Sequence, residues 1–317
     1  MTEDFVSADR SSSSLVWKFA AGIVTIASLV WVAWLLVKVW PDIVEHGTQI
    51  LLVPLLIGFA LSLVASYLTF EAFATLVRIL GISRMPRREL AHLHFTAQLL
   101  KHLPGRVWGV GYQWAAGSAA GSLGDWLWVN LAHMLLATFF ALWSSSLALG
   151  FSHGLKWGAL TAVIGMMGYV VGWLIVSSHR LSSWLTLLPG RFGKLSSGIS
   201  ATLEKAPASA RVKVFLLFSV SWLFYYASWF MNGMAYPPLG PNAAMQLCAY
   251  YMLAWFVGYL SLLTPSGLGV RELVFAWLAK DFPGDAVAIM ALVGRVGSLA
   301  VDLVLGLAFA PFVPRKL

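Results

Sequence analysis

Six stretches of this chain are apolar and at least 20 residues long, and this length limits its fold more than any other feature. An α-helix needs about 20 apolar residues to cross the hydrocarbon core of a bilayer. The stretches are Trp17–Val39, Gln49–Val77, Asp125–Leu149, Trp157–Val176, Val212–Tyr236 and Asp285–Phe312. Because lipid cannot satisfy free backbone groups, each stretch is predicted to be a transmembrane helix.

The composition supports lipid as the solvent of this chain. Apolar residues make up 59% of its 317 positions and charged residues 11%, whereas soluble domains have roughly 45–50% and about 25%. The sixteen Trp residues fit the same class, because Trp favours the membrane–water interface. The sequence therefore predicts an all-α integral membrane protein. Residues 1–16 are expected to form a cytoplasmic tail, and residues 17–317 a single transmembrane domain whose first helix is retained.

Two further apolar segments, Glu89–Ala116 and Asn242–Lys280, are interrupted by proline and glycine. The first interruption is Pro104-Gly105, and the second is the run Pro265-Ser-Gly-Leu-Gly269. Proline removes a backbone donor and glycine relaxes the backbone dihedrals, so each site predicts a broken helix. At membrane depth, a broken helix requires protein or a water-filled cavity around its freed backbone groups.

The positions of Lys and Arg predict the topology. They gather in three groups: Arg78, Arg84, Arg87 and Arg88; Arg180, Arg191, Lys194, Lys205, Arg211 and Lys213; and Arg315 and Lys316. The positive-inside rule places these groups in the cytoplasm, together with both termini. The net charge of +8 is therefore interpreted as a topology signal, with a further role at anionic head groups, and not as a nucleic-acid surface.

With this topology, each broken segment enters and leaves on one side of the membrane. The expected fold has about six full transmembrane helices and two re-entrant broken-helix hairpins. They form an inverted repeat over roughly residues 49–149 and 212–312, an architecture that transporters use. In the alternative, the segment Asn242–Leu263 crosses the membrane completely, since it is long enough to do so.

Several ionisable residues lie beside the breaks or in the last span. A charge in the membrane core costs about 2.5–3.5 kcal/mol on insertion, so each is a candidate functional residue. They are Lys101, Arg106, Arg271, Glu272, Arg295 and Asp302. Positions 295 and 302 are seven residues apart and share a helix face. One interpretation is a buried ion network that only holds the helices together.

The functional hypothesis is a polar cavity for an anionic group between the two breaks. Arginine forks match the geometry of phosphate. Helices that start after the two breaks would also direct free backbone N–H groups at the same place. The cationic residues expected around this cavity are Lys101, Arg106, Arg271 and Arg295. Glu71 and Asp125 lie near predicted helix ends, where interfacial solvation or the helix dipole accounts for them.

The usual signatures of enzymes and metal sites are missing. The single cysteine, Cys248, permits no internal disulfide and no CxxC motif. Ser266 lacks the flanking pattern of a nucleophile elbow, and no Walker-type loop occurs. His92, His94 and His102 have no neighbouring carboxylate or cysteine that would complete a metal site. We therefore expect no cofactor and no metal, and we expect a transporter rather than an enzyme, with a transferase kept as an alternative.

The two breaks also resemble the motifs of a known family. The runs Lys101-His-Leu-Pro-Gly-Arg-Val-Trp108 and Thr264-Pro-Ser-Gly-Leu-Gly-Val-Arg-Glu272 resemble the paired signatures of the flippase-like membrane domain. This domain is the transmembrane region of lysylphosphatidylglycerol synthases and also occurs alone. The resemblance extends from about Trp17 to Phe312. The chain departs from the pattern at Ser266, where glycine is common, and at Gln113, where arginine often follows the first motif.

The resemblance implies that the protein moves a lipid head group across the bacterial inner membrane. By analogy with stand-alone members, the expected substrate is an anionic lipid, such as a polyprenyl-phosphate-linked sugar or another envelope-glycan precursor. A phospholipid or aminoacyl-phospholipid flippase or scramblase is an alternative. An integral membrane enzyme, or an accessory subunit of a glycosyltransferase, is an alternative of another class. Lysyl transfer is not expected, because no soluble aminoacyl-transferase region follows in the sequence.

The substrate-binding residues expected from the residues and the resemblance together surround both breaks and include the last span. They are Lys101, Pro104, Gly105, Arg106, Pro265, Ser266, Gly267, Gly269, Arg271, Glu272, Arg295 and Asp302. The expected partners are the anionic substrate lipid, other membrane lipids and enzymes of envelope-glycan biosynthesis. Glu272 and Asp302 are expected to orient the arginines or to couple a proton.

Overall fold

The computed structural model describes residues 50–82, 85–102, 108–117, 121–152, 154–176, 207–260, 267 and 269–314. Over these ranges the chain forms nine α-helices and no strand, which confirms the all-α prediction. Four helices of the described part are long and apolar enough to cross a membrane. They are α2 (Leu52–Ile79), α5 (Leu123–Ser152), α9 (Ala208–Met234) and α12 (Gly284–Phe309). The predicted span Trp17–Val39 lies outside the described residues.

Both segments that the sequence predicts to be broken consist of two helices. The first contains α3 (Arg87–Leu100) and α4 (Trp108–Ala116), and the second contains α10 (Pro241–Leu260) and α11 (Val270–Leu278). The remaining helix, α6 (Leu155–Val176), packs against α5. Prolines mark several of the helix starts, because a proline is compatible with the first turn of a helix. Pro86, Pro207 and Pro283 directly precede α3, α9 and α12.

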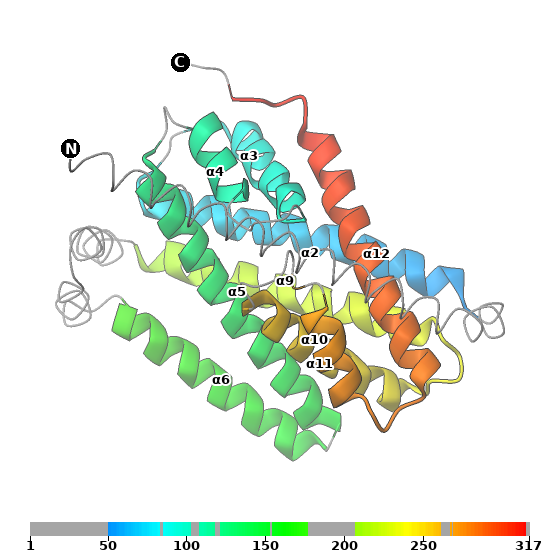
Figure 1. Ribbon diagram of the computed structural model, residues 1–317. Coiled ribbons are helices and arrows are strands. Elements are labelled where there is room, and N and C mark those ends of the chain that lie inside the picture. Colours follow the sequence, from blue (N-terminus) through cyan, green and yellow to red (C-terminus); the bar gives the residue numbers. More distant parts are fainter. Residues whose placement is uncertain are drawn as a thin grey trace, which may run out of the picture.

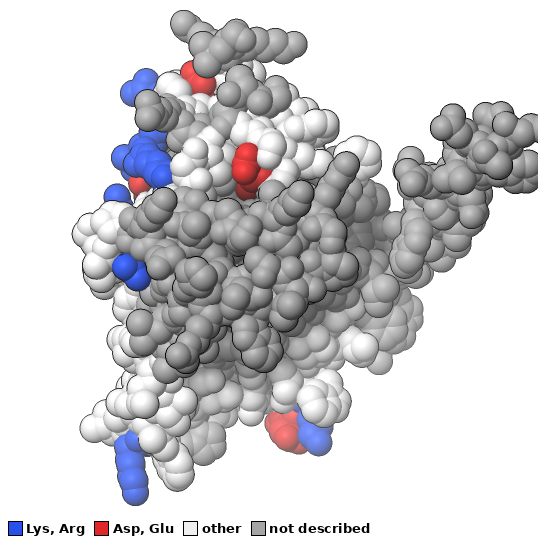
Figure 2. All heavy atoms as spheres, turned by 90° about the vertical axis from the view of Figure 1, so that its left-hand side faces the viewer, with Lys and Arg blue, Asp and Glu red and all other residues white. Residues whose placement is uncertain are grey.

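Large apolar side chains cover the outside of the described bundle. Leu52 and Val53 are each 66% exposed, and Leu135 on α5, Leu223 on α9 and Leu307 on α12 are all more than half exposed. Soluble proteins rarely expose apolar surface to this extent. On the face seen in Figure 2, several of the described Lys and Arg side chains gather at the upper left, and other charged side chains lie at the lower end. This distribution matches a helical membrane protein.

Helices α2 and α9 lie side by side and antiparallel through the middle of the bundle (Figure 1). The Leu51 N–H donates to the Ala235 carbonyl at 2.9 Å, so the start of α2 meets the end of α9. Further along, Ser62 Oγ lies 2.6 Å from Ser228 Oγ. The backbones approach closely at Gly58, where a Cβ atom would lie 2.9 Å from the Ser228 carbonyl oxygen. Small residues permit this kind of close packing between membrane helices.

Each pair of short helices leaves and returns at one end of the bundle. Tyr236, which follows α9, donates a hydrogen bond to Asp285 at the start of α12, so α10 and α11 begin and finish together. Ile82, which follows α2, lies against Gly121 just before α5, where a Cβ atom would be 2.8 Å from its side chain. Because α2 and α9 are antiparallel, the two pairs start from opposite ends.

The packing of α2–α5 is mirrored by that of α9–α12. Helix α3 packs against α12, and α10 packs correspondingly against α5. Helix α12 contacts α2, as α5 contacts α9, and α2 with α9 forms the largest interface. Exchanging α2, α3, α4 and α5 with α9, α10, α11 and α12 thus preserves the pattern of contacts. Two similar four-helix units of opposite direction form most of the described bundle.

Candidate functional site

The inner end of the first helix pair lies against the middle of α12. Lys101 directly follows α3, and its Nζ lies 2.8 Å from Asp302 Oδ2. His102 Nε2 lies 2.8 Å from the same oxygen, although these two residues are 200 positions apart. A cation at the C-terminus of a helix is also stabilised by the helix dipole. Asp302 is buried, so Lys101 and His102 together supply the partners that a buried carboxylate needs.

The inner end of the second helix pair also reaches α12. Gly269 precedes α11 with φ of 81°, a conformation that favours glycine. Its N–H donates to Glu272 Oε2 at 2.9 Å. The other oxygen, Oε1, accepts from Arg295 Nε at 2.8 Å and from Arg271 Nε at 3.4 Å. Glu272 therefore caps α11 and pairs with two arginines at once.

Arg271 is the least satisfied charged group of this site. It is 4% exposed, and its guanidinium carbon lies 5.1 Å from the centre of the Tyr251 ring. Its Nη2 is buried and has no hydrogen-bond partner within the described part of the chain. A buried donor left unpaired costs about 1–3 kcal/mol, and more when it is charged. Such a donor, in a cationic group that faces a polar cluster, fits an anion.

The two clusters form one site along α12. Arg295 and Asp302 are seven residues apart, which corresponds to about 10 Å along a helix, and both lie in the central part of α12. Lys101, Arg271 and Arg295 oppose the carboxylates of Glu272 and Asp302. These five residues thus carry one excess positive charge when His102 is neutral. Anions gain most from an excess positive charge where water is scarce.

Of the predicted binding residues, seven are described. Lys101, Arg271, Glu272, Arg295 and Asp302 belong to the two clusters, and Gly267 and Gly269 shape the chain before α11. Gly267 has φ of 68°, and a Cβ atom there would lie 2.5 Å from the Gly258 carbonyl oxygen. Outside the described residues lie Pro104, Gly105, Arg106, Pro265 and Ser266. The prediction that Arg106 and Arg271 line one shared cavity therefore involves a residue outside the described part of the chain.

One backbone donor at the start of α11 is already occupied. The backbone N–H of Gly269 is not free for a ligand, because the Glu272 carboxylate of the same helix accepts its hydrogen bond. The physical reason is local: a glutamate three residues into a helix can reach back to the capping N–H. An anion that enters this site therefore meets Glu272 as a competitor at the start of α11.

Glu71 and Asp125 have structural roles near helix ends, as the sequence predicts. Glu71 Oε1 accepts a hydrogen bond from Arg87 Nε at 2.8 Å, and this contact raises the pKa of the Arg87 guanidinium. Asp125 Oδ2 accepts from the Ser122 N–H at 2.8 Å, while Ser122 Oγ accepts from the Asp125 N–H at 3.3 Å. This reciprocal pair is a capping box for α5. Neither carboxylate belongs to the charged clusters on α12.

Four polar side chains beyond the predicted binding residues lie wholly or partly buried in the apolar helices. Gln113 on α4 is 1% exposed and accepts from Asn130 Nδ2 on α5 at 2.6 Å. His94 and His133 are buried among aromatic rings, with their ring centres 5.8 Å apart. All four are polar residues inside apolar runs. The sequence analysis names Gln113 and His94, and the same signal could have drawn attention to Asn130 and His133. In the described part of the chain, no group of three His, Cys, Asp or Glu side chains could hold a metal ion.

Fold, surface and buried charge place the protein in the class of helical membrane proteins. No protein-family model matches the chain, and a comparison with curated proteins finds no match.

Proposed function

We propose that this protein is a lipid flippase of the bacterial inner membrane that moves an anionic head group through the site on α12. The observation that carries the proposal is Arg271, whose buried Nη2 lacks a partner in the described part of the chain. The excess positive charge of the two clusters supports the same ligand class. Apolar exposure around the bundle supports a substrate whose tail stays in lipid.

The proposed membrane arrangement has two re-entrant hairpins, α3–α4 from the cytoplasm and α10–α11 from outside. The contacts that hold the ends of each hairpin together support this topology. The antiparallel packing of α2 and α9 supports an inverted repeat, and the basic groups near Arg78–Arg88 support cytoplasmic termini. Both hairpin tips then lie near the membrane midplane, where transporters of this architecture bind substrate.

In this mechanism Glu272 acts as an internal anion that the substrate phosphate replaces. The phosphate binds Nη2 of Arg271 first, because this donor has no competing partner. It then competes with Glu272 for Arg295, whose guanidinium makes contacts of 2.8 and 3.3 Å to the two carboxylate oxygens. The next cation is Lys101, which pairs with Asp302, and Asp302 lies about 10 Å along α12 from Arg295. A head group can pass between these cations while its tail remains in the bilayer.

The proposed substrate class is a polyprenyl-phosphate-linked sugar or a similar envelope-glycan precursor. The resemblance of both break motifs to the flippase-like membrane domain supports this choice. Arginine-rich recognition of phosphate supports it as well, since Arg271 and Arg295 present forked donors. The enzymes that make or consume such lipids are the partners that we propose.

The decisive experiment measures transbilayer movement in vesicles that contain the pure protein and a fluorescent polyprenyl-phosphate sugar. Wild-type protein should expose the inner-leaflet label to a membrane-impermeant quencher, and Arg271→Ala should slow this exposure at least tenfold. Arg271→Lys should be intermediate, because it retains the charge and loses the fork. Lys280→Ala is the matched control, since Lys280 is exposed beyond the end of α11.

Two results would contradict the proposal. Normal transport by Arg271→Ala would show that Arg271 does not form a phosphate site that transport requires. Chemical conversion of the lipid in the presence of a sugar donor, without movement between leaflets, would instead assign the protein to the transferases. Arg271→Ala should remain folded, because Arg295 still neutralises Glu272. Circular dichroism and gel filtration of the variant check this point.

A further inference from the structure

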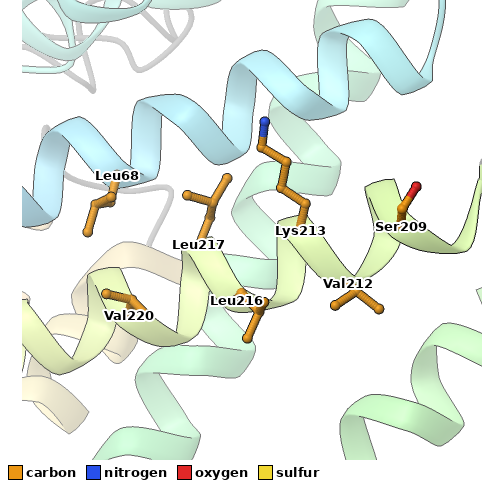
Figure 3. A pocket seen from close by; sticks show the side chains of 7 residues that line it. All are labelled: Leu68, Ser209, Val212, Lys213, Leu216, Leu217 and Val220. Atoms are coloured by element: carbon orange, nitrogen blue, oxygen red, sulfur yellow. The ribbon is translucent and has the colours of Figure 1, made fainter.

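A groove runs along the outer surface of the bundle between α2 and α9. Its volume is about 500 Å³, and its lining includes Leu68 of α2 and Leu216, Leu217 and Val220 of α9. In Figure 3 the side chains of Leu68 and Leu217 extend into the space between the two helices. Leu216 is 53% exposed and Val220 39% exposed, so the groove opens outward. It shares no lining residue with the charged clusters on α12. The groove is therefore a second feature, separate from the proposed transport site.

One end of the groove is basic. In Figure 3 the Lys213 side chain extends from α9 toward α2, beside Ser209. A second cavity of about 410 Å³ adjoins this end, shares Lys213 and Ser209, and adds Arg78 and Thr75 of α2. The described linings of the two cavities contain no carboxylate. An apolar channel thus leads into a cationic and hydroxyl-bearing end.

The opening of the groove follows from the packing of the two helices. At the other end of the interface, Gly58 and the Leu51–Ala235 hydrogen bond bring α2 and α9 together. Toward Lys213 the groove is lined by the larger side chains of Leu68, Leu216, Leu217 and Val220. The groove therefore belongs to the half of the interface that lies next to the basic groups at Arg78 and Lys213.

The length of the groove matches one leaflet of a membrane. Ser209 and Val220 are 11 positions apart on α9, which is about 16 Å along a helix. Half of a hydrocarbon core of about 30 Å is about 15 Å. A single lipid chain in the groove would therefore reach from the basic end to about the bilayer centre.

We propose that this groove binds an anionic membrane lipid from the cytoplasmic leaflet. One acyl chain lies against Leu68, Leu216 and Val220, and the phosphate lies between Arg78 and Lys213. Charge complementarity identifies the occupant, because two cations without a carboxylate in the described lining attract a net anionic head group more strongly than a zwitterionic one, whose own cation offsets its phosphate. Anionic lipids of the cytoplasmic leaflet also attract basic residues at the membrane surface. The lipid stabilises the half of the α2–α9 interface that lacks close backbone packing.

The test uses native mass spectrometry of the whole protein with phosphatidylglycerol or phosphatidylcholine of identical chains. Wild-type protein should retain one phosphatidylglycerol at least fivefold more strongly than phosphatidylcholine. Lys213→Ala combined with Arg78→Ala should remove this preference, while Lys213→Arg should retain it. Leu216→Trp should weaken binding of both lipids by filling the groove. Matched controls are Lys280→Ala and Leu135→Trp, which alter exposed residues elsewhere.

Four results would overturn the proposal. Three of them are equal retention of the two lipids by wild type, an unchanged preference in the Arg78 and Lys213 double variant, and unchanged lipid binding by Leu216→Trp. Soluble glycerol phosphate that displaces the lipid completely would also overturn it, because it would show a head-group site without a role for the groove. Transport activity does not enter these measurements, so the outcome is independent of the proposed flippase function.

Discussion

At the scale of single residues, Glu272 connects three parts of the site. Its carboxylate caps α11 through the Gly269 N–H and accepts hydrogen bonds from Arg271 and Arg295. The sequence shows that these charges are close along the chain or on one helix face, but not that one carboxylate serves all three partners. That arrangement depends on Gly269, whose positive φ turns the chain so that Glu272 reaches back to the helix start.

We predict that Glu272→Gln lowers the free energy of unfolding by about 3–5 kcal/mol, as expected when a buried ion pair loses one partner. Glutamine can still cap α11, so the loss reflects the two uncompensated arginines. The double variant Glu272→Gln, Arg295→Gln should lose less than the sum of the single changes, because it leaves one buried cation instead of two. Thermal unfolding in detergent measures these differences. Additive losses would show that Glu272 and Arg295 are not energetically coupled.

At the scale of helices, glycine determines how closely the arms of the second hairpin pack. A Cβ atom at Gly258 on α10 would lie 2.9 Å from the Arg271 Cβ atom on α11. In the first hairpin, a Cβ atom at Gly109 on α4 would lie 2.9 Å from the Ala97 carbonyl oxygen of α3. Each pair thus has a glycine at the contact between its two arms. The contact at Gly258 sets the position of Arg271.

Gly258→Ala should therefore displace Arg271 and slow lipid movement at least tenfold, with a loss of stability of about 1–3 kcal/mol from overpacking. Gly297→Ala is the control, since nothing lies within 4 Å of a Cβ atom at that position on α12. It should leave stability unchanged or raise it by up to about 1 kcal/mol, because alanine favours a helix. Transport and thermal unfolding are measured on both variants. Equal effects of the two changes would contradict a specific contact between Gly258 and Arg271.

Helices and breaks could be predicted from the sequence because their signals are local. Apolar length predicts α2, α5, α9 and α12, and proline with glycine predicts both interruptions. The contact between His102 and Asp302 could not be predicted, since it joins positions 200 residues apart through tertiary packing. The direction of α10 was also open, because its 20 residues suffice to cross a membrane. The contact of Tyr236 with Asp285 supports the proposed return of this segment to the end from which it started.

At the scale of the whole molecule, the antiparallel α2–α9 interface relates the two four-helix units. Because their helix pairs start from opposite ends, the inner tips of both pairs reach the same central part of α12. The proposed re-entrant topology requires the ends of each pair to lie on one side of the membrane. Asn242 and Asp281 flank the second pair, and both are exposed. Labelling these two positions from one side of the membrane therefore distinguishes a re-entrant hairpin from a complete crossing by α10.

We predict that Asn242→Cys and Asp281→Cys both react with a membrane-impermeant maleimide added to intact spheroplasts. Arg88→Cys, at the start of the first pair, should react only after the membrane is permeabilised. The native Cys248 is fully buried and is the single cysteine of the chain, so each variant carries one accessible thiol. Reaction of positions 242 and 281 from opposite sides would show that the segment crosses the membrane. The tips of the two helix pairs would then not be the ends of opposed hairpins, and the proposed midplane site would lose its structural basis.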